Sequence, residues 1–480
     1  MVAVIGDGAL TGGHAYEGLN NAGRFPKNFI VVLNDNKMSI SKNVGAIARY
    51  LAHIRTKPGY LKMKGSIEKT LDRIPVIGRP INRFLLNSKS VLKQMLYHST
   101  LFEDMGFLYY GPFDGHNIPQ LIKVLQTAKS ISHPVLLHVI TSKGKGYPFA
   151  EKNPGAFHGI SCFDIKTGEA EASGDNFSRE FGICLCNMAK QDDRICAITA
   201  AMETGTGLSG FKKEFPDRFF DVGIAEEHAV TFAGGLAVGG MLPVFGVYST
   251  FLQRGVDQVI HDAALQNAKV TLAIDRAGVV GEDGETHQGL FDVALLNAVP
   301  NVTIFTPSYY EELSIFLNTA VYGCTGVAAV RYPRGHQLYR PADFTVTGNP
   351  YDVYGDAGAQ TVLVTYGRLF SFACLARERL KKENIPVKIL KLNRVKPLDP
   401  GALAFCRQAG RIFFFEEGMR RGGIGEHFSC LLYQQGYRGK IVLHAVKSGF
   451  VQQATMGESL SELGLDDKGM ETIIKTEFEK

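Results

Sequence analysis

The chain has 480 residues, of which 45% are hydrophobic and 21% charged, the composition of a globular protein of about three domains. Its net charge of +5 is too small to indicate nucleic-acid binding, and no apolar run reaches the roughly 18 residues that a membrane-spanning helix needs. The eight cysteines include no C-x-x-C pair, and no basic segment precedes an apolar N-terminal stretch. We therefore expect a cytoplasmic protein without a zinc site, a disulfide framework or a signal peptide.

Residues 1–160 are expected to form one α/β domain. The strand VAVI, a helix ending at Gly23 and the strand FIVVL have the order and spacing of a βαβ crossover, which favours a parallel sheet. A basic helical insertion is expected at about 47–100, where 11 Lys or Arg residues between Arg49 and Lys93 accompany only two acids. We interpret it as a solvated helical insertion, with a basic lid over a phosphorylated ligand as the alternative.

Two further α/β domains are expected to follow. A polar linker at 161–176 precedes a domain at 177–337, and a second linker at 338–356, rich in Pro, Gly, Asp and Thr, precedes a domain at 357–480. Strand-like runs such as ICAITA, KVTLAID and TVLVTYG alternate in both domains with helical patterns. This alternation indicates parallel sheets covered by helices.

Polar side chains follow both strands of the first βαβ unit: Asp7 in GDG and Asn36 in NDNKMS. Ligands of α/β proteins bind at the carboxyl ends of the strands, and a carboxylate and an amide oxygen are ligands that Mg²⁺ prefers. The glycines nearby let the backbone approach a phosphate at a helix N-terminus. Either motif alone would more commonly be a tight turn or an Asx turn. Together, 29 residues apart, they match the signature of thiamine diphosphate-binding proteins.

The segment GIAEEHAVTFAGG places two carboxylates at the head of a predicted helix, between apolar residues. Burial there would raise the pKa of a carboxyl group, and such an acid can form a hydrogen bond to N1′ of the thiamine aminopyrimidine. We assign this role to Glu226, since Glu227 points elsewhere on a helix. The alternative is that both carboxylates only stabilise the helix N-terminus through its dipole.

Three later segments, VYSTFLQR, DRAGVVGEDGETHQG and RYPRG, carry further polar and aromatic candidates. These residues are Tyr248, Phe251, Arg254, Arg276, Asp283, His287, Arg331 and Arg334. Phe251 is interpreted as a ring that stacks on the pyrimidine, with a place in the core as the alternative. The two arginines of RYPRG suit a phosphate or carboxylate because guanidinium binds such groups through two hydrogen bonds. A lone loop arginine is more commonly solvated, so Arg254 and Arg331 carry less weight.

Taken together, these motifs resemble the 1-deoxy-D-xylulose-5-phosphate synthase family of the transketolase group, over essentially the whole chain. The resemblance implies three α/β domains of transketolase type: two parallel-sheet domains that bind thiamine diphosphate and a C-terminal α/β domain. It also implies Mg²⁺, a homodimer, and a reaction that decarboxylates pyruvate and joins it to D-glyceraldehyde 3-phosphate. The products would be 1-deoxy-D-xylulose 5-phosphate, a precursor of isoprenoids, thiamine and pyridoxal, and CO2.

The resemblance also implies roles for individual residues. Mg²⁺ would be held by Asp7, Asn36 and the carbonyl of Met38. The other residues expected to contact the cofactor are Gly8, Ala9, Tyr147, Glu226 and Phe251. The residues expected to contact the substrates are Tyr248, Arg254, Arg276, His287 and Arg334. The expected catalytic residues are Glu226, His287, His158 and Asp283.

Two features depart from the family pattern. His14 stands where family members usually have Met, and we have no explanation for it. Family members also carry a long N-terminal stretch before the strand VAVI, with loops that grip the diphosphate. We therefore expect a synthase sequence that lacks its N-terminal part, through a fragment boundary, a misassigned start or a split gene. The alternatives are another thiamine diphosphate enzyme, such as transketolase or a 2-oxoacid dehydrogenase subunit, and a non-catalytic partner subunit.

Overall fold

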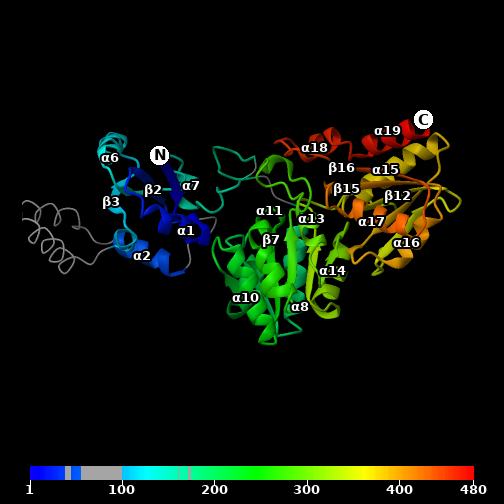
Figure 1. Cartoon of the computed structure of the whole chain (residues 1–480), viewed down its shortest axis with the longest axis horizontal. Helices are drawn as coiled ribbons and strands as arrows, with labels where there is room; N and C mark the ends of the chain where they lie inside the picture. Colours follow the sequence, from blue (N-terminus) through cyan, green and yellow to red (C-terminus); the bar gives the residue numbers. More distant parts are fainter. Residues whose placement is uncertain (38–44, 56–99, 161, 171–173, 480) are drawn as a thin grey trace, which may run out of the picture. The chain divides into compact units, whose positions relative to one another are not determined.

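The computed structural model describes residues 1–37, 45–55, 100–160, 162–170 and 174–479. They form two compact units (Figure 1). The smaller unit comprises Met1–Glu171 with the short segment Gly223–Ala225, and the larger unit comprises Ala172–Val222 and Glu226–Lys480. Each unit is described separately below.

The smaller unit is built on a four-stranded parallel sheet with the strand order β1-β2-β4-β3. Its strands are β1 (Val2–Gly6), β2 (Phe29–Asp35), β3 (Leu108–Asp114) and β4 (Pro134–Ile140). β1 and β2 pair in register from Val2 opposite Ile30 to Gly6 opposite Asn34. This register places Asp7 and the residues after β2 at the same edge of the sheet, as the sequence predicts.

Helices cover both faces of this sheet. They are α1 (Gly13–Ala22), α2 (Gly45–Arg55), α5 (Leu101–Asp104), α6 (Ile118–Ser130) and α7 (Pro148–Lys152). Leu19 of α1 and Phe102 of α5 pack with Leu33 of β2, whereas Ala128 of α6 packs on the opposite face with Ile30. The arrangement buries apolar side chains on both faces, as a parallel sheet requires. Of the predicted basic insertion, residues 56–99 lie outside the described residues.

The larger unit contains two sheets. The first has seven strands in the order β14-β9-β10-β8-β7-β5-β6, all parallel except β14. These strands are β5 (Ile195–Thr199), β6 (Phe219–Asp221), β7 (Leu242–Tyr248), β8 (Thr271–Asp275), β9 (Val302–Phe305), β10 (Val327–Arg331) and β14 (Arg394–Lys396). The helices around it include α8 (Phe177–Ala189), α9 (Ser209–Glu214), α10 (Glu226–Val238), α11 (Ser249–Leu252), α12 (Val256–Gln258), α13 (Asp292–Asn297) and α14 (Tyr310–Asn318).

The second sheet of the larger unit, the C-terminal sheet, has the strand order β11-β13-β12-β15-β16. Its strands are β11 (Tyr351–Gly355), β12 (Thr361–Tyr366), β13 (Val387–Leu392), β15 (Arg411–Met419) and β16 (Lys440–Val446), and only β11 is antiparallel to its neighbour. The helices of this region are α15 (Leu369–Lys382), α16 (Pro400–Arg407), α17 (Ile424–Gln434), α18 (Met456–Glu462) and α19 (Asp467–Phe478).

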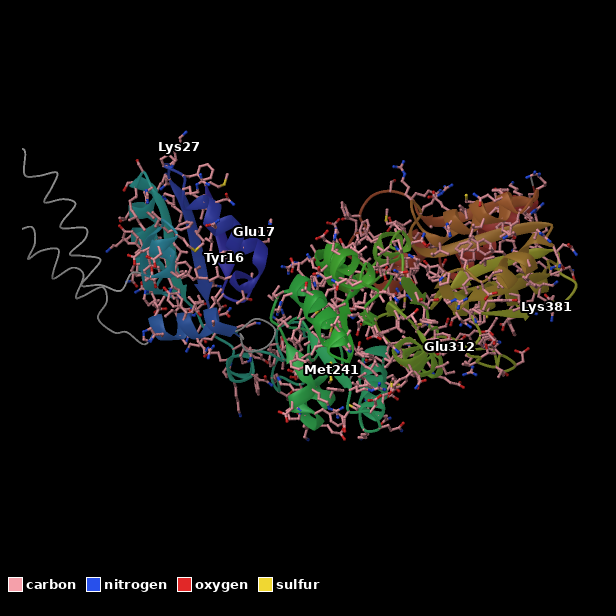
Figure 2. All side chains as sticks on the ribbon, turned by 60° about the horizontal axis from the view of Figure 1, so that its bottom comes forward. Tyr16, Glu17, Lys27, Met241, Glu312 and Lys381 are labelled. Carbon is pink, nitrogen blue, oxygen red and sulfur yellow. The ribbon has the colours of Figure 1, made fainter. Side chains whose placement is uncertain are left out.

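The two sheets of the larger unit are connected by a strand of one region that pairs with the other sheet, and by a buried ion pair. β14 follows β13 of the C-terminal sheet in the chain, but it pairs with β9 of the seven-stranded sheet. Glu312 of α14, labelled in Figure 2, forms a fully buried ion pair with Lys391 of β13 at 2.7 Å. Its other carboxylate oxygen accepts the N–H of Ser308 at 2.7 Å. A buried charge is tolerated only when it is paired in this way, so the two sheets have one preferred alignment.

The predicted α/β fold class with parallel sheets is confirmed. The structure differs from the expected organisation in two places: β11 lies inside the segment 338–356 that we expected to be a linker, and β14 joins the sheet of the preceding region. Both strands are short and carry charged residues, so their pattern does not distinguish them from loops. Among the described residues, no helix combines the length and apolar character needed to cross a bilayer.

Phe245 provides a test of the core of the larger unit. It lies in the centre of β7 and is fully buried. Phe245→Ala is expected to lower the free energy of unfolding by about 3–5 kcal/mol, because a large cavity is left in a packed sheet. Phe450→Ala, at a side chain that is 72% exposed, is the matched control and should change it by less than about 0.5 kcal/mol. Equal effects in urea denaturation would contradict the position of β7 at the core.

Candidate active site

Two buried carboxylates mark the predicted cation site of the smaller unit. Asp7 follows β1 and Asp35 ends β2, and both are buried. The backbone N–H of Lys37 donates to Asp7 Oδ2 at 2.9 Å and to Asp35 Oδ1 at 3.3 Å. Burial, together with the neighbouring Asp35, raises the pKa of Asp7 to about 6. Two carboxylates brought together in this way attract a cation, and their oxygens suit a hard divalent ion.

Asp35 is held by a buried chain of hydrogen bonds through His138 and Tyr109. His138 Nε2 lies 2.9 Å from Asp35 Oδ2, and His138 Nδ1 lies 2.7 Å from the hydroxyl of Tyr109. All three residues are buried. Such a chain fixes the orientation of the carboxylate, because each polar group forms a hydrogen bond with the next one.

Lys143 lies near Asp7 and contacts His158. Lys143 Nζ is 2.5 Å from His158 Nδ1. Burial lowers the pKa of Lys143, and nearby Asp7 opposes that shift. Burial and Lys143 both lower the pKa of His158, so its imidazole is neutral at physiological pH. Tyr147 lies in an aromatic cluster with Phe149, and its hydroxyl donates to the carbonyl of Ile165 at 2.9 Å.

The first turn of the smaller unit leaves space beside its backbone. A Cβ built on Gly6 or Gly13 meets no atom within 4 Å. Packing within the described residues therefore does not require glycine at these positions. Close approach of a ligand such as a phosphate to the backbone would require it.

In the larger unit, Glu226 is the first residue of α10, and its side chain is buried. Burial raises the pKa of Glu226, although Arg254 lowers it through an ion pair of 2.6 Å between Arg254 Nη1 and Glu226 Oε2. Glu227 is one-third exposed, and its Oε1 lies 3.6 Å from Arg254 Nη2. A buried acid whose neutral form is favoured can donate a hydrogen bond to a ring nitrogen.

Arg276 and Tyr248 form the next part of the site. The Arg276 guanidinium lies 3.7 Å from the centroid of the Tyr248 ring, a cation–π contact. Arg276 has a positive φ of 59°, and its Nη1 donates to the carbonyl of Gly205 at 2.9 Å. A Cβ on Gly205 would lie 1.6 Å from the Tyr248 hydroxyl, so this position requires glycine. Burial raises the pKa of Tyr248 to about 12.

The residues after Arg276 complete the cluster. Asp283 Oδ1 is 2.8 Å from Arg334 Nη1, and Asp283 Oδ2 is 3.9 Å from Arg276 Nε. The His287 ring makes an edge contact with Phe251 at 5.3 Å between ring centroids, and Phe251 stacks beside Tyr248 at 5.7 Å. These contacts join six of the predicted site residues in one cluster: Tyr248, Phe251, Arg276, Asp283, His287 and Arg334. Glu226 and Arg254 form a separate ion pair in the same unit.

Comparison with known proteins shows the family of the chain. The family model described as 1-deoxy-D-xylulose-5-phosphate synthase matches residues 1–141, and the transketolase pyrimidine-binding and C-terminal models match residues 176–340 and 353–470. A curated 1-deoxy-D-xylulose-5-phosphate synthase of Symbiobacterium thermophilum is 46% identical over 98% of this chain and 73% of its own length. One from Clostridium kluyveri is 47% identical over 89% of this chain and 69% of its own length. The chain belongs to the 1-deoxy-D-xylulose-5-phosphate synthase family.

Membership of this family makes the chain a transferase of the transketolase class that depends on thiamine diphosphate. Two solved structures support the fold alone, since their sequence identity is low. A split-gene transketolase, described as an inactive β4 tetramer, has a TM-score of 0.55 at 23% identity and covers 63% of this chain and 98% of its own. A transketolase from Campylobacter jejuni has a TM-score of 0.54 at 17% identity and covers 99% of this chain and 77% of its own.

The sequence reasoning missed several groups in this family member. It did not identify the Asp35–His138–Tyr109 chain, the amine of Lys143 or the carbonyl of Gly205. The motif SKGKGY held a signal for Lys143. The buried histidine carried no signal, because it sits in the apolar run HPVLLHVIT, which reads simply as a strand.

One interpretation of an arginine was wrong, and one predicted metal ligand lies outside the residues that the structure describes. Arg331 does not lie on a loop with Arg334. It is the last residue of β10 and pairs with Asp292 in the core, with Nε at 2.8 Å from Oδ2. Met38, the predicted third magnesium ligand, lies outside the described residues. His14 is 94% exposed, with Nδ1 3.7 Å from Glu17 Oε2, and its presence in place of Met has no structural explanation.

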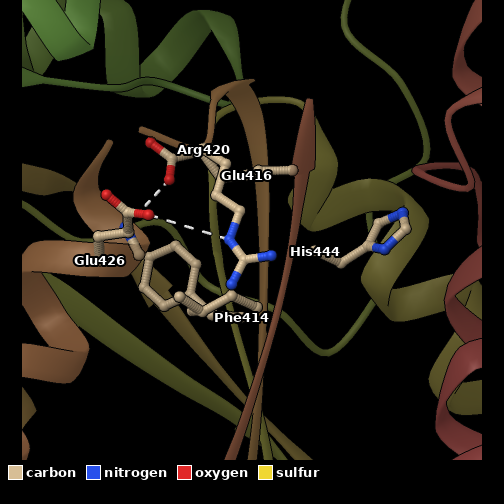
Figure 3. Close-up of a pocket in the computed structure, with 8 residues that line it drawn as sticks. Phe414, Glu416, Arg420, Glu426 and His444 are labelled. Atoms are coloured by element: carbon tan, nitrogen blue, oxygen red, sulfur yellow. Dashed lines mark hydrogen bonds and ion pairs between the residues drawn. The ribbon is translucent and has the colours of Figure 1, made fainter. Parts of the chain in front are cut away.

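A pocket in the C-terminal sheet contains none of the predicted site residues (Figure 3). Its buried carboxylate, Glu416, already accepts hydrogen bonds from the N–H groups of Ile424 and Gly425. Its imidazole, His444, has Nε2 2.7 Å from the carbonyl of Leu463. We therefore assign no ligand to this pocket.

The environment of Glu226 predicts a pH dependence of stability. Because burial raises the pKa of Glu226 above its ordinary value of 4.5, folding favours the protonated carboxyl group. The stability that this group contributes is therefore complete below pH 4.5 and is lost as the pH rises through its folded-state pKa. In thermal denaturation between pH 4 and pH 8, the stability of the parent protein relative to Glu226→Gln should fall as the pH rises, by about 1.4 kcal/mol for each pKa unit between the unfolded and folded states. A relative stability that increases with pH would show that Arg254 dominates over burial.

Proposed function

We propose that the chain catalyses the thiamine diphosphate-dependent decarboxylation of pyruvate and its condensation with D-glyceraldehyde 3-phosphate. The products are 1-deoxy-D-xylulose 5-phosphate, which feeds isoprenoid, thiamine and pyridoxal synthesis, and CO2. The observation that carries the proposal is the buried acid Glu226 at the start of α10, in the same unit as the cluster that holds Phe251, Arg276 and Arg334.

The smaller unit has the groups that a magnesium diphosphate needs. Asp7, with Asn36 and the carbonyl of Met38 as predicted partners, supplies oxygen ligands for Mg²⁺. The space beside Gly6 and Gly13 admits a diphosphate, and Lys143 supplies a positive charge near Asp7. Gly8, Ala9 and Tyr147 are the remaining proposed contacts. His158, kept neutral, can accept or donate a proton near a substrate carbonyl.

The larger unit has the groups that a pyrimidine and a phosphorylated aldehyde need. When bound, thiamine diphosphate supplies the electron sink for decarboxylation. The neutral carboxyl group of Glu226 donates a hydrogen bond to the pyrimidine, and Phe251 presents an aromatic face beside it. Arg276, Arg334 and Tyr248 bind the phosphate of the aldehyde, with Arg254 as a further positive charge. Asp283 orients the two arginines, and His287 holds a proton at the reacting carbonyl.

The proposal also includes the domain division, the metal, the oligomeric state and the location of the protein. The three-domain division at 1–160, 177–337 and 357–480 is proposed on the three family matches and on the three sheets, apart from the edge strands β11 and β14, which pair across these bounds. Mg²⁺ as the metal is proposed on the oxygen donors around Asp7. A homodimer and a cytoplasmic location are proposed on the family resemblance. Sedimentation of the purified chain tests whether it forms a homodimer.

The proposed reaction is tested by CO2 release from labelled pyruvate with the purified chain, Mg²⁺ and thiamine diphosphate. We expect release to depend on D-glyceraldehyde 3-phosphate and to yield a phosphorylated pentulose of five carbons. Transfer of a two-carbon ketol group from a ketose phosphate to an aldose phosphate, without CO2 release, would instead assign a transketolase activity. No turnover with either set would show that this chain lacks the activity by itself.

The role of Glu226 is tested by a pair of adjacent variants. Glu226→Gln removes the acidic proton without changing the shape of the side chain and is expected to lower kcat by about 10²–10⁴-fold. Glu227→Gln, one residue further along α10, is the control and should stay within about threefold of the parent, the margin expected for a group without an acid–base role. Far-UV and near-UV circular dichroism should be unchanged in both. A Glu226→Gln variant that keeps the parent kcat would remove Glu226 from the reaction.

A further inference from the structure

The glycine-rich segment Arg276–Gly289, here called the substrate loop, is closed at its neck by a backbone pair. The Gly278 N–H donates to the carbonyl of Gly289 at 2.7 Å, and the Gly289 N–H donates back at 2.8 Å. The loop carries Arg276 before this neck and Asp283 and His287 beyond it. Val279 and Val280, just inside the neck, are buried, so the loop is anchored there.

The anchor is an ion pair of the C-terminal sheet. Glu417 of β15 accepts the N–H of Val279 at 2.6 Å through Oε1. Arg368, at the start of α15, binds Glu417 with Nε at 3.1 and 3.0 Å from the two carboxylate oxygens. Its Nη2 donates both to Glu417 Oε1 and to the carbonyl of Val279. One buried ion pair therefore satisfies both backbone groups of Val279.

The pair lies where the direction of strand connections reverses in the C-terminal sheet. β12 and β15 are adjacent, and the chain leaves β12 toward β13 on one side and β15 toward β16 on the other. The crevice at the carboxyl ends of two such strands is where α/β sheets bind their ligands. Arg368 follows β12 and Glu417 lies near the end of β15, so in this chain the crevice binds the peptide group of Val279.

The loop is built to fit this crevice. Gly278 has a positive φ of 87°, and a Cβ there would lie 2.4 Å from the carboxylate of Glu417. Within the loop, Gln288 accepts the Val280 N–H at 2.9 Å. From outside the loop, Gln453 donates to the carbonyl of Glu282 at 3.0 Å.

We propose that Arg368 and Glu417 form a positioning pair for recognition of the substrate phosphate. By holding the Val279 peptide, the pair fixes Arg276 three residues before it and Asp283 four residues after it, and Asp283 aligns Arg334. Neither member touches the cluster itself. The inference rests on the proposed function, since it assigns the phosphate of the aldehyde to Arg276 and Arg334.

The energetics favour a positioning role over simple stabilisation. A buried ion pair gains little net stability over apolar residues of the same volume, because both charges lose their hydration. A well-packed apolar contact would hold two sheets together equally well. It would not orient both the N–H and the C=O of one peptide, which a bidentate guanidinium–carboxylate pair does.

The test compares three variants of the larger unit in the full chain. Glu417→Gln keeps the shape of the side chain but removes the charge, and Arg368→Met removes the guanidinium. Arg377→Met is the matched control, since Arg377 also lies on α15 and forms an ion pair, with Asp356 at 2.7 Å, away from the loop. The first readout is amide hydrogen exchange at Val279 and Val280 in the ligand-free protein. The second is the ratio of kcat/KM for D-glyceraldehyde 3-phosphate to that for D-glyceraldehyde, which isolates recognition of the phosphate.

We expect exchange at Val279 and Val280 to be at least about tenfold faster in Glu417→Gln and Arg368→Met, and the phosphate ratio to fall by about tenfold or more. Arg377→Met should change neither. Equal losses for both aldehydes, or exchange unchanged from the parent, would overturn the proposal. Should Arg368→Met fail to fold, Glu417→Gln decides. Hydrogen exchange requires no turnover, so it tests the anchoring of the loop even if the parent chain lacks the proposed activity. Exchange that stays unchanged in the variants would then still overturn the proposal.

Discussion

A charge removed from water must meet an opposite charge, and the larger unit depends on this constraint at the contacts between its elements. Arg331 at the end of β10 pairs with Asp292 of α13, Lys391 of β13 pairs with Glu312 of α14, and the substrate loop is held by a third such pair. Breaking one buried pair leaves the remaining charge uncompensated, at a cost of about 3–5 kcal/mol. If one sheet moved relative to the other, these pairs would break and this free energy would be lost. The pairs therefore favour one alignment of the sheets.

The same constraint sets the chemistry of the site. Glu226 is buried deeply enough to favour its neutral form, yet Arg254 stands close enough to oppose that effect, so two environmental forces of opposite sign tune one carboxyl group. Asp283 pairs with Arg334, and the buried Asp275 pairs with Arg276 at 3.1 Å, so both guanidinium groups are oriented without a substrate. Groups arranged in advance need no reorganisation during the reaction, and this preorganisation is the main electrostatic contribution of a protein to catalysis.

Motifs in the sequence predicted much of this arrangement because they are local. The strand VAVI followed by GDG predicts a residue at the carboxyl end of a parallel strand, and the register of β1 with β2 confirms that Asp7 shares this edge with the residues after β2. Family membership extends the same reasoning to Glu226 and the glycine-rich loop. The strands β11 and β14 were not foreseen, since short, charged edge strands gain their pairing from partners distant in the sequence.

The sequence by itself determined the family, the α/β class and the residue types that meet at the site, because these depend on hydrophobic periodicity and on motifs within one strand–loop–helix unit. Only the tertiary structure decided which charges meet. The pairing of Asp35 with His138, of Arg331 with Asp292 and of Arg368 with Glu417 joins residues separated by 39 to 103 positions. Such pairs form only after the sheets have assembled, because the chain's own pattern does not distinguish a charge that will be buried and matched from one that stays in water.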